Sequence, residues 1–328
     1  MKAVFITEFG GVENLEIREV ADAPRPANSE VLVQVRAAGL NRADLLQRRG
    51  LYMPPPGFSP NIPGLEFAGE IVECGPDVED LANGDRVCGI TAGEAQAEYL
   101  TIDASLLAAI PDTLTFPEAA AVPEAFVTAH DAVVTQAELR AGELLLIHAV
   151  GSGVGLAALQ IGKALGANAI GTSRSADKLG RCTEFGLDLG VEFTDSTDLA
   201  AVVAGKFSGR GADVILDLVG APYFEQNLKA LATKGRLMLV GLTGGRTANF
   251  DLSLALYKRA TIKGTVLRAR PIEEKAAAMR AFEADVAPLF ETGQLTANLD
   301  RAFPFAEVRA AHEYLESNLS FGKVVLEW

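Results

Sequence analysis

The most informative segment of this 328-residue chain is Leu144-Leu-Leu-Ile-His148-Ala-Val-Gly151-Ser-Gly153-Val-Gly155. Its apolar beginning, Leu144–His148, predicts a short buried strand, and the residues from Gly155 to Leu165 predict a helix. A glycine-rich turn between a strand and a helix offers backbone N–H groups and the positive end of a helix dipole to an anion. The segment therefore predicts a pyrophosphate site. Because the strict G-x-G-x-x-G spacing is not met, tight packing is the alternative explanation.

Short apolar runs alternate with amphipathic stretches on the C-terminal side of this turn. The predicted strands are 169–172, 189–193, 213–218, 237–240 and 260–266, and the predicted helices are 177–185, 197–207 and 223–231. Such alternation is typical of a parallel sheet that is covered by helices on both faces.

The two ends of the chain show a different pattern. Extended runs such as 30–38 and 66–74, divided by glycine and proline, predict a mostly antiparallel or barrel-like domain in the first 120 residues. The tail predicts helices over 273–290 and 305–318 and a strand over 323–326. We expect the tail to pack on the first domain. The predicted division is therefore 1–122, 123–266 and 267–328, with the outer two segments in one domain.

Composition and charge exclude several classes of protein. The chain carries 29 Lys and Arg against 43 Asp and Glu, a formal net charge of −14, which disfavours binding to nucleic acid or anionic lipid. Three cysteines without a C-x-x-C pattern exclude a disulfide scaffold and a cysteine-rich zinc site. The apolar run at the N-terminus is too short for a signal peptide, and the uncharged stretch 144–162 contains the glycine turn. We expect a cytoplasmic protein that does not enter a membrane.

The end of the second strand of the parallel sheet indicates the cofactor. An NAD site usually has an acidic residue there, whereas this chain has Thr172-Ser173-Arg174-Ser175-Ala-Asp177-Lys178. These polar and basic residues suit a 2′-phosphate, which predicts NADPH. The alternative is that Ser175 only caps a helix and Lys178 is a solvated helix residue. A helix N-terminus can be capped and still bind phosphate, so the two interpretations are compatible.

Several further motifs carry a family resemblance through their order and spacing. They are Gly39-Leu-Asn41-Arg-Ala-Asp44, Pro63-Gly64-Leu-Glu66-Phe-Ala-Gly69-Glu-Ile-Val, Gly84-Asp85-Arg86-Val87, His148-Ala149 through Gly155-Leu-Ala-Ala158, Asp213-Val-Ile-Leu-Asp217-Leu-Val-Gly220, Leu267-Arg-Ala-Arg270 and Gly322-Lys323-Val-Val-Leu326. Together they resemble the zinc-independent quinone oxidoreductases of the medium-chain dehydrogenase/reductase superfamily, relatives of zeta-crystallin. The p53-inducible quinone oxidoreductase subgroup is the most similar. The resemblance covers nearly the whole chain.

This resemblance implies a fold and an activity. The fold is α/β, with a Rossmann doubly wound parallel sheet and a GroES-like, mostly β catalytic domain. The activity is NADPH-dependent, metal-free reduction of a quinone. The alternative is a reductase of enones, alkenals or enoyl thioesters on the same fold. A third possibility, a nucleotide-bound structural or RNA-binding protein, is disfavoured by the net charge of −14. A homodimer paired through the edge strand at 260–266 is also expected.

No metal is expected. Zinc alcohol dehydrogenases of the superfamily hold the catalytic metal with Cys, His and Cys, and the matching positions are Asn41, Leu65 and Glu124. Leucine cannot bind zinc, and a catalytic site normally needs three protein ligands. None of the three histidines has metal-ligand spacing, and His148 is expected to be a core or turn residue.

The resemblance also implies site residues. Asn41 and Tyr52 would orient substrate, Thr128 would position the nicotinamide, and Gly241 and Leu267 would line the cofactor site through their backbones. The predicted cofactor-binding set is completed by Ala149, Gly151, Ser152, Gly153, Val154, Gly155, Ser173, Arg174, Ser175 and Lys178. Asn41 has helix capping as its alternative role, Tyr52 has loop packing, and Thr128 has a bond to its own backbone.

Three positions depart from the family pattern. Ser152 replaces a glycine of the turn, and Arg174 stands where glycine is common, where it could contact phosphate or stack on adenine. Phe193 replaces a tyrosine that is used near the 2′-phosphate, which weakens the prediction of NADPH slightly.

Overall fold

Strand β8 (Leu144–Ile147) lies inside a six-stranded parallel sheet in the computed structural model, which describes residues 1–328. The strand order is β10-β9-β8-β11-β12-β13. The other strands are β9 (Asn168–Ser173), β10 (Leu189–Glu192), β11 (Ala212–Asp217), β12 (Leu231–Leu239) and β13 (Thr261–Gly264). In β8, Leu146 is paired with Ile170 on one side and Ile215 on the other, and all three are fully buried.

The chain moves outward from β8 in two directions. It runs through β9 to β10 on one side, then returns to β11 and continues through β12 to β13 on the other. This is a doubly wound sheet, as the resemblance implied, and ligands bind such sheets where the strand order reverses. Here the reversal lies between β8 and β11.

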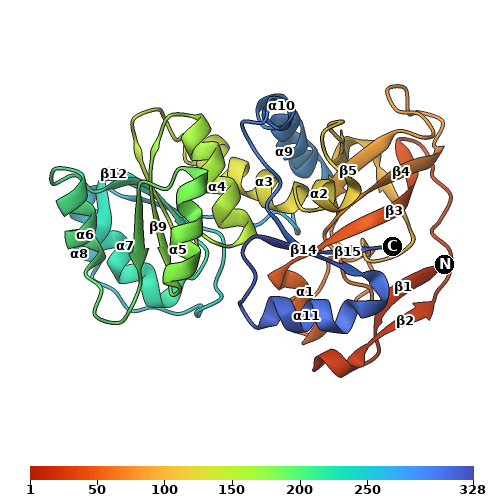
Figure 1. Ribbon diagram of the computed structural model, residues 1–328, viewed down its shortest axis with the longest axis horizontal. Helices are drawn as coiled ribbons and strands as arrows, with labels where there is room; N and C mark the ends of the chain where they lie inside the picture. The colour runs from red at the N-terminus through yellow and green to blue at the C-terminus, as the bar shows by residue number, and fades with distance from the viewer. The chain divides into compact units, whose positions relative to one another are not determined.

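Helices follow the strands of this sheet in sequence and are drawn around it in Figure 1. They are α4 (Gly153–Ala164), α5 (Ala176–Cys182), α6 (Leu199–Lys206), α7 (Phe224–Ala230) and α8 (Leu252–Lys258). Helix α8 was not predicted; it has seven residues, and none of them is fully buried. The edge strand β13 is exposed along its whole length.

The chain divides into two compact units. The second unit, residues 128–266, contains the parallel sheet. The first unit consists of residues 1–127 and 267–328. The division falls within helix α3 (Pro123–His130), which is followed by a π-helical turn at Asp131–Gln136.

A seven-stranded, mostly antiparallel sheet forms the centre of the first unit. Its main path is β14-β15-β3-β4-β5-β7, and β6 pairs with β3 off this path. The strands are β3 (Glu30–Leu40), β4 (Glu66–Cys74), β5 (Arg86–Ile90), β6 (Tyr99–Asp103), β7 (Leu107–Ala109), β14 (Leu299–Pro304) and β15 (Lys323–Glu327). A separate hairpin pairs β1 (Lys2–Ile6) with β2 (Leu15–Glu19). The tail thus joins the first unit, because β15 pairs with β3.

The helices of the first unit are α1 (Arg42–Arg48), α2 (Phe116–Ala120), α9 (Ile272–Asp285), α10 (Ala287–Glu291) and α11 (Val308–Glu316). The prediction of one helix over 273–290 is wrong, because the chain breaks at Val286 between α9 and α10. Pro288 lacks the N–H that a continuous helix needs and stands in the first turn of α10, where that loss costs nothing.

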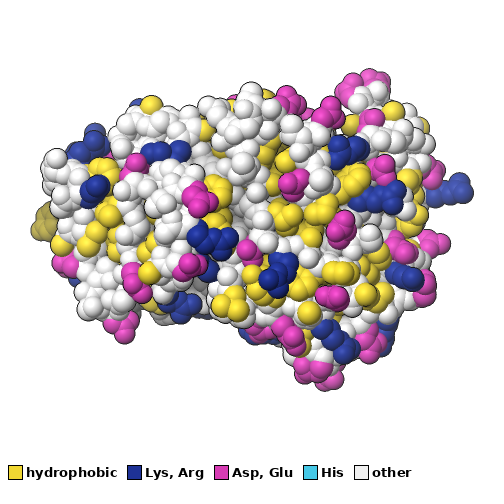
Figure 2. Space-filling model, in the orientation of Figure 1, with side chains coloured by type: hydrophobic (Ala, Val, Ile, Leu, Met, Phe, Trp, Pro, Cys, Tyr) yellow, Lys and Arg dark blue, Asp and Glu magenta, His cyan; other side chains and the backbone are white.

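No helix has both the length and the apolar content to cross a membrane. On the face shown in Figure 2, basic and acidic side chains are interspersed, and the basic ones form no single large patch.

Candidate functional site

The turn after β8 has the geometry of an anion site. Ala149 adopts a left-handed conformation with φ 49°, which is uncommon for a residue with a Cβ and is typical of functional turns. Ser152 caps α4 by accepting a hydrogen bond from the Gly155 N–H at 3.2 Å. The family resemblance implies a glycine at this position, and here a capping residue replaces it. The twelve-residue helix α4 still begins at the turn.

Two glycines allow this turn to pack closely. A Cβ on Gly155 would lie 2.5 Å from the carbonyl oxygen of Ala149 and 2.7 Å from that of Val150. A Cβ on Gly171, at the end of β9, would lie 2.6 Å from Val150 Cγ1. Close packing therefore does not exclude phosphate binding, because the glycines that bring α4 against β9 also shape the turn. The residues fit the pyrophosphate of a dinucleotide.

The end of β9 carries the polar residues that were predicted for a 2′-phosphate. Ser173 accepts a hydrogen bond from the Ser175 N–H at 3.1 Å, and Ser175 caps α5 by accepting from the Lys178 N–H at 3.3 Å. The side chain of Arg174 is exposed, and that of Lys178 is half-buried. Ser175 is thus a helix cap, as the alternative interpretation held, and no carboxylate stands at Thr172, Ser173 or Arg174.

Two aromatic rings pack against each other near the ends of β10 and β11. The rings of Phe193 and Tyr223 lie 3.8 Å apart between centroids with an angle of 32°. Burial raises the pKa of Tyr223, while nearby Arg174 lowers it and Asp217 raises it. A phenol therefore lies against Phe193, the position at which the family resemblance implies a tyrosine. His148 is fully buried and bonds Thr172 and Asn227, so it is a core residue, as predicted.

The remaining predicted residues of the cofactor site are spread over several elements. Gly151, Gly153 and Val154 lie in the turn and the first turn of α4. Thr128 is half-buried on α3. Gly241 follows β12, where a Cβ would lie 2.6 Å from the Leu218 carbonyl oxygen. Leu267 begins the return segment of the first unit and has a buried side chain.

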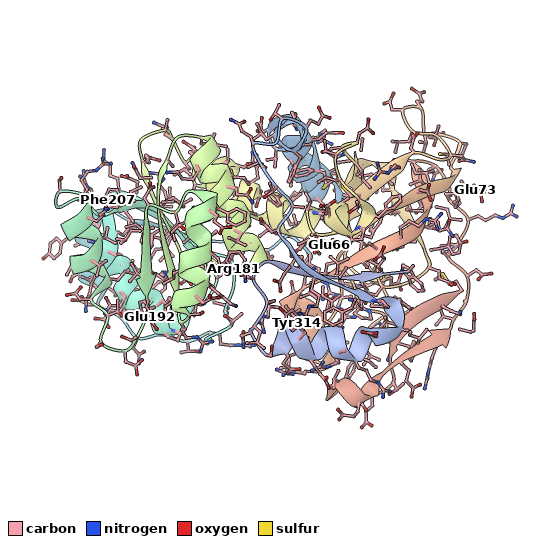
Figure 3. All side chains as sticks on the ribbon, viewed as in Figure 1. Glu66, Glu73, Arg181, Glu192, Phe207 and Tyr314 are labelled. Atoms are coloured by element: carbon pink, nitrogen blue, oxygen red, sulfur yellow. The ribbon has the colours of Figure 1, made fainter.

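The first unit holds a buried cluster of charged side chains around Glu66, which begins β4 and is labelled in Figure 3. The Glu66 carboxylate is fully buried. Its Oε1 accepts from Asn41 Nδ2 at 2.8 Å and from Lys323 Nζ at 2.5 Å, and its Oε2 accepts from the Glu124 N–H at 2.9 Å. Lys323 Nζ also donates to Asn41 Oδ1 at 2.6 Å and to the Leu40 carbonyl at 2.7 Å. Asn41 is therefore held on both ends of its amide.

Asp44 supports the same cluster from α1. It is fully buried, and its carboxylate accepts from the Asn41 N–H at 2.7 Å and the Gly64 N–H at 3.0 Å. Burial raises the pKa of Asp44 to about 6, although these two N–H groups and the cations of Lys323 and Arg268 lower it. Gly64 has φ 114° and no room for a Cβ, which would lie 2.5 Å from Gln96 N. Its glycine is thus required for the bond to Asp44.

Arg268 and Tyr52 lie in contact with each other near the cluster around Glu66. Arg268 is 4% exposed and donates to the carbonyl of Ala92 at 2.7 Å, to the carbonyl of Tyr52 at 3.1 Å and to Gln47 Oε1 at 2.5 Å. Its guanidinium lies 5.0 Å from the centre of the Tyr52 ring, a cation–π contact. Burial raises the pKa of Tyr52, the positive charge of Arg268 lowers it and Glu124 raises it. Arg268 thus fixes both the backbone and the ring of Tyr52.

Glu124, in the first turn of α3, is the most perturbed acid of this cluster. Burial raises its pKa to about 8, and the negative charges of Glu66 and Asp44 raise it further, against the positive charges of Lys323 and Arg268. Lys275 on α9 also faces it, with a pKa lowered by burial and raised by Glu124. The Glu124 carboxyl is half-buried.

These residues do not fit a catalytic zinc ion. Asn41 has its amide oxygen on Lys323, and Leu65 is a buried hydrocarbon. No group of three His, Cys, Asp or Glu side chains has the geometry of a metal site. Because a catalytic zinc ion needs about three protein ligands, we derive no step through a metal.

The sequence predicts roles for Asn41 and Tyr52 but not for the residues that hold them. Glu66, Lys323 and Arg268 were recognised only as parts of motifs, and Glu124 only as a replaced zinc position. A signal was present: Glu66 and Lys323 each adjoin an apolar strand sequence, where a charge is expected to be paired.

Comparisons with known proteins identify the family of this chain. The protein family described as "Alcohol dehydrogenase GroES-like domain" matches residues 27–131, and the family "Zinc-binding dehydrogenase" matches residues 153–284. A "Quinone oxidoreductase" from Lama guanicoe is 32% identical over 329 residues, covering 99% of this chain and 97% of that protein.

Two solved structures are similar over nearly the whole chain. Mycobacterial Rv1454c complexed with NADPH has a TM-score of 0.89 at 28% identity and full coverage of both chains. The CurK enoyl reductase has a TM-score of 0.86 at 26% identity, with 99% of this chain and 98% of that chain covered.

Proposed function

Because the chain belongs to the quinone oxidoreductase-like proteins of the medium-chain dehydrogenase/reductase superfamily, we propose that it is a zinc-independent, NADPH-dependent quinone oxidoreductase. The observation that carries the proposal is the fixed amide of Asn41. At a position where zinc enzymes have a metal ligand, its oxygen and nitrogen are tied to Lys323 and Glu66. A fixed hydrogen-bonding scaffold thus replaces the metal ligand.

The second unit would hold the cofactor. When bound, NADPH supplies the hydride. The turn from Ala149 to Gly155 would bind its pyrophosphate, because the N-terminus of α4 favours negative charge. Ser173, Arg174, Ser175 and Lys178 would bind the 2′-phosphate. Thr128 would position the nicotinamide, and Gly241 and Leu267 would line the site through their backbones.

The first unit would orient the acceptor. Asn41 and Tyr52 are placed by the Glu66 and Arg268 contacts, so they can hold a carbonyl in one orientation without reorganising during the reaction. Quinones accept a hydride without strong electrophilic assistance, so a metal-free site is chemically adequate.

The test is NADPH oxidation followed by absorbance, with 1,4-benzoquinone or 9,10-phenanthrenequinone as acceptor and with protein dialysed against a chelator. We expect full activity after dialysis and little with NADH. Absence of quinone reduction while NADPH still binds would refute the proposal.

A second candidate function is reduction of enones, 2-alkenals or enoyl thioesters, which the likeness to the CurK enoyl reductase favours. Crotonyl thioester and 2-alkenals, assayed beside the quinones, separate the two. The better value of kcat/KM identifies the acceptor class.

We also propose a homodimer. Strand β13 is an unpaired edge of the parallel sheet, and α8 exposes Leu252, Leu256 and Tyr257 by 73%, 71% and 79%. Pairing the edges would satisfy unpaired backbone groups and cover these apolar side chains.

A further inference from the structure

The Glu124 carboxyl is the acid of the buried cluster that no hydrogen-bond donor reaches. Its backbone N–H is bound to Glu66, but neither of its carboxyl oxygens has a hydrogen-bonding partner. Glu66 receives three donors and Asp44 receives two. Glu124 is therefore the one carboxyl of this cluster that accepts no hydrogen bond from the protein.

None of the nearby cations donates a hydrogen bond to Glu124. The three protons of Lys323 go to Glu66, Asn41 and the Leu40 carbonyl. The three bonds of Arg268 go to Ala92, Tyr52 and Gln47. Lys275 faces Glu124 without a hydrogen bond to it.

The charges that face Glu124 come from every element around it. Negative charge comes from Glu66 on β4 and Asp44 on α1, and positive charge from Lys323 on β15, Arg268 in the return segment and Lys275 on α9. Tyr52 on the loop after α1 is the remaining titratable neighbour. A carboxylate without donors beside two other carboxylates is costly, whereas a carboxylic acid is not. Glu124 is thus held as a neutral O–H donor, and its partial exposure leaves it reachable.

We propose that Glu124 is the catalytic acid that protonates the reduced acceptor. The inference rests on the proposed function and adds a residue to it. An O–H donor without a protein acceptor, beside the Asn41 and Tyr52 that would orient the substrate, is placed to bond a substrate carbonyl.

A quinone acceptor gains a hydride, which carries both electrons, from the reduced nicotinamide. The Glu124 O–H bond breaks, its proton moves to the developing phenolate oxygen, and its electron pair stays on the carboxylate. Water then returns a proton to Glu124. For an enone the same proton goes to the α-carbon of the enolate.

Tyr52 is the competing donor, and acidity decides between them. The pKa of Tyr52 is raised above its ordinary value of 10, whereas that of Glu124 is about 8. Transfer from the group whose pKa lies nearer the working pH is more efficient. In this arrangement Tyr52 orients the carbonyl, and Glu124 supplies the proton.

The experiment compares Glu124→Gln with the wild type in quinone reduction between pH 6 and 10. Glu283→Gln is the matched control, because it makes the same change of side chain at an exposed position on α9. We expect kcat of the wild type to fall as pH rises through about 8, as the donor is lost. Glu124→Gln should lose roughly 10- to 100-fold in kcat at pH 7 and show no such fall, with NADPH affinity unchanged. Glu283→Gln should match the wild type.

A second measurement does not depend on turnover. The infrared spectrum of the free protein at pH 7 should contain the carbonyl band of a protonated carboxylic acid, and Glu124→Gln should lose that band. Glu124→Asp, which keeps a carboxyl, should retain part of the rate and the pH dependence. An unchanged kcat and alkaline limb in Glu124→Gln, or an unchanged infrared band, would overturn the inference. A wild type that binds NADPH but reduces neither quinones nor enones would instead overturn the proposed function.

Discussion

Replacing Gly155 by alanine should damage the phosphate turn by a predictable amount. The new Cβ would stand 2.5 Å from the Ala149 carbonyl oxygen, whereas ordinary contact begins at 3.4 Å. The other close atoms, Val150 O and Cα at 2.7 and 2.8 Å, also belong to the backbone, so no side chain can rotate away. The start of α4 must therefore move relative to the turn.

Overpacking of this kind costs about 1–3 kcal/mol of stability. The displaced turn should also lose at least one charge-assisted hydrogen bond to the pyrophosphate, worth about 1.5–3 kcal/mol. At about 1.4 kcal/mol per factor of ten, NADPH and NADH should both bind about 10- to 150-fold more weakly. The affinity for both cofactors should fall, because both carry the pyrophosphate.

Isothermal titration calorimetry with both cofactors, together with urea unfolding, measures these effects. Gly205→Ala is the control, since Gly205 lies in α6 and a Cβ added there would have no neighbouring atom within 4 Å. It should bind both cofactors normally and gain about 0.5–1 kcal/mol from the better helix propensity of alanine. Normal cofactor affinity in Gly155→Ala would refute the assignment of the phosphate to this turn.

Four further outcomes are expected. Lys178→Ala should weaken NADPH binding about 10- to 100-fold in calorimetry while NADH binding is nearly unchanged; equal losses would make Lys178 a simple helix residue. Elemental analysis should find no stoichiometric zinc, and a chelator should leave activity intact. Light scattering at micromolar concentration should give twice the chain mass of 34.6 kDa, and Tyr257→Lys should shift it towards the monomer. Glu124→Gln should raise the free energy of unfolding by ~1–3 kcal/mol at pH 9 and leave it unchanged near pH 4. Since the folded pKa of Glu124 is raised from 4.5 to about 8, the wild type is penalised as pH rises through that window.

Local sequence patterns were enough to predict the parallel sheet and its glycine turn. The strands β8, β9 and β11 and the helix α4 lie where apolar runs and helical spacing predicted them, because such periodicities are local properties of the chain. The same locality explains the failures. Helix α8 has only seven residues, too few for a helical period to stand out from a mostly apolar sequence, and the break at Val286 depends on one proline inside a helical composition.

The cluster around Glu66 depends on contacts between distant parts of the chain. Asn41 meets Glu66 from 25 residues away and Lys323 from 282 residues away, because β15 at the end of the chain pairs with β3 near its beginning. No local pattern records such a pairing. The sequence therefore indicated the residues that would touch a cofactor or a substrate, while the fold decided which charges are paired in the interior. Glu124 shows the difference: its chemistry depends on its burial and on the charges packed around it, and no short sequence pattern encodes them.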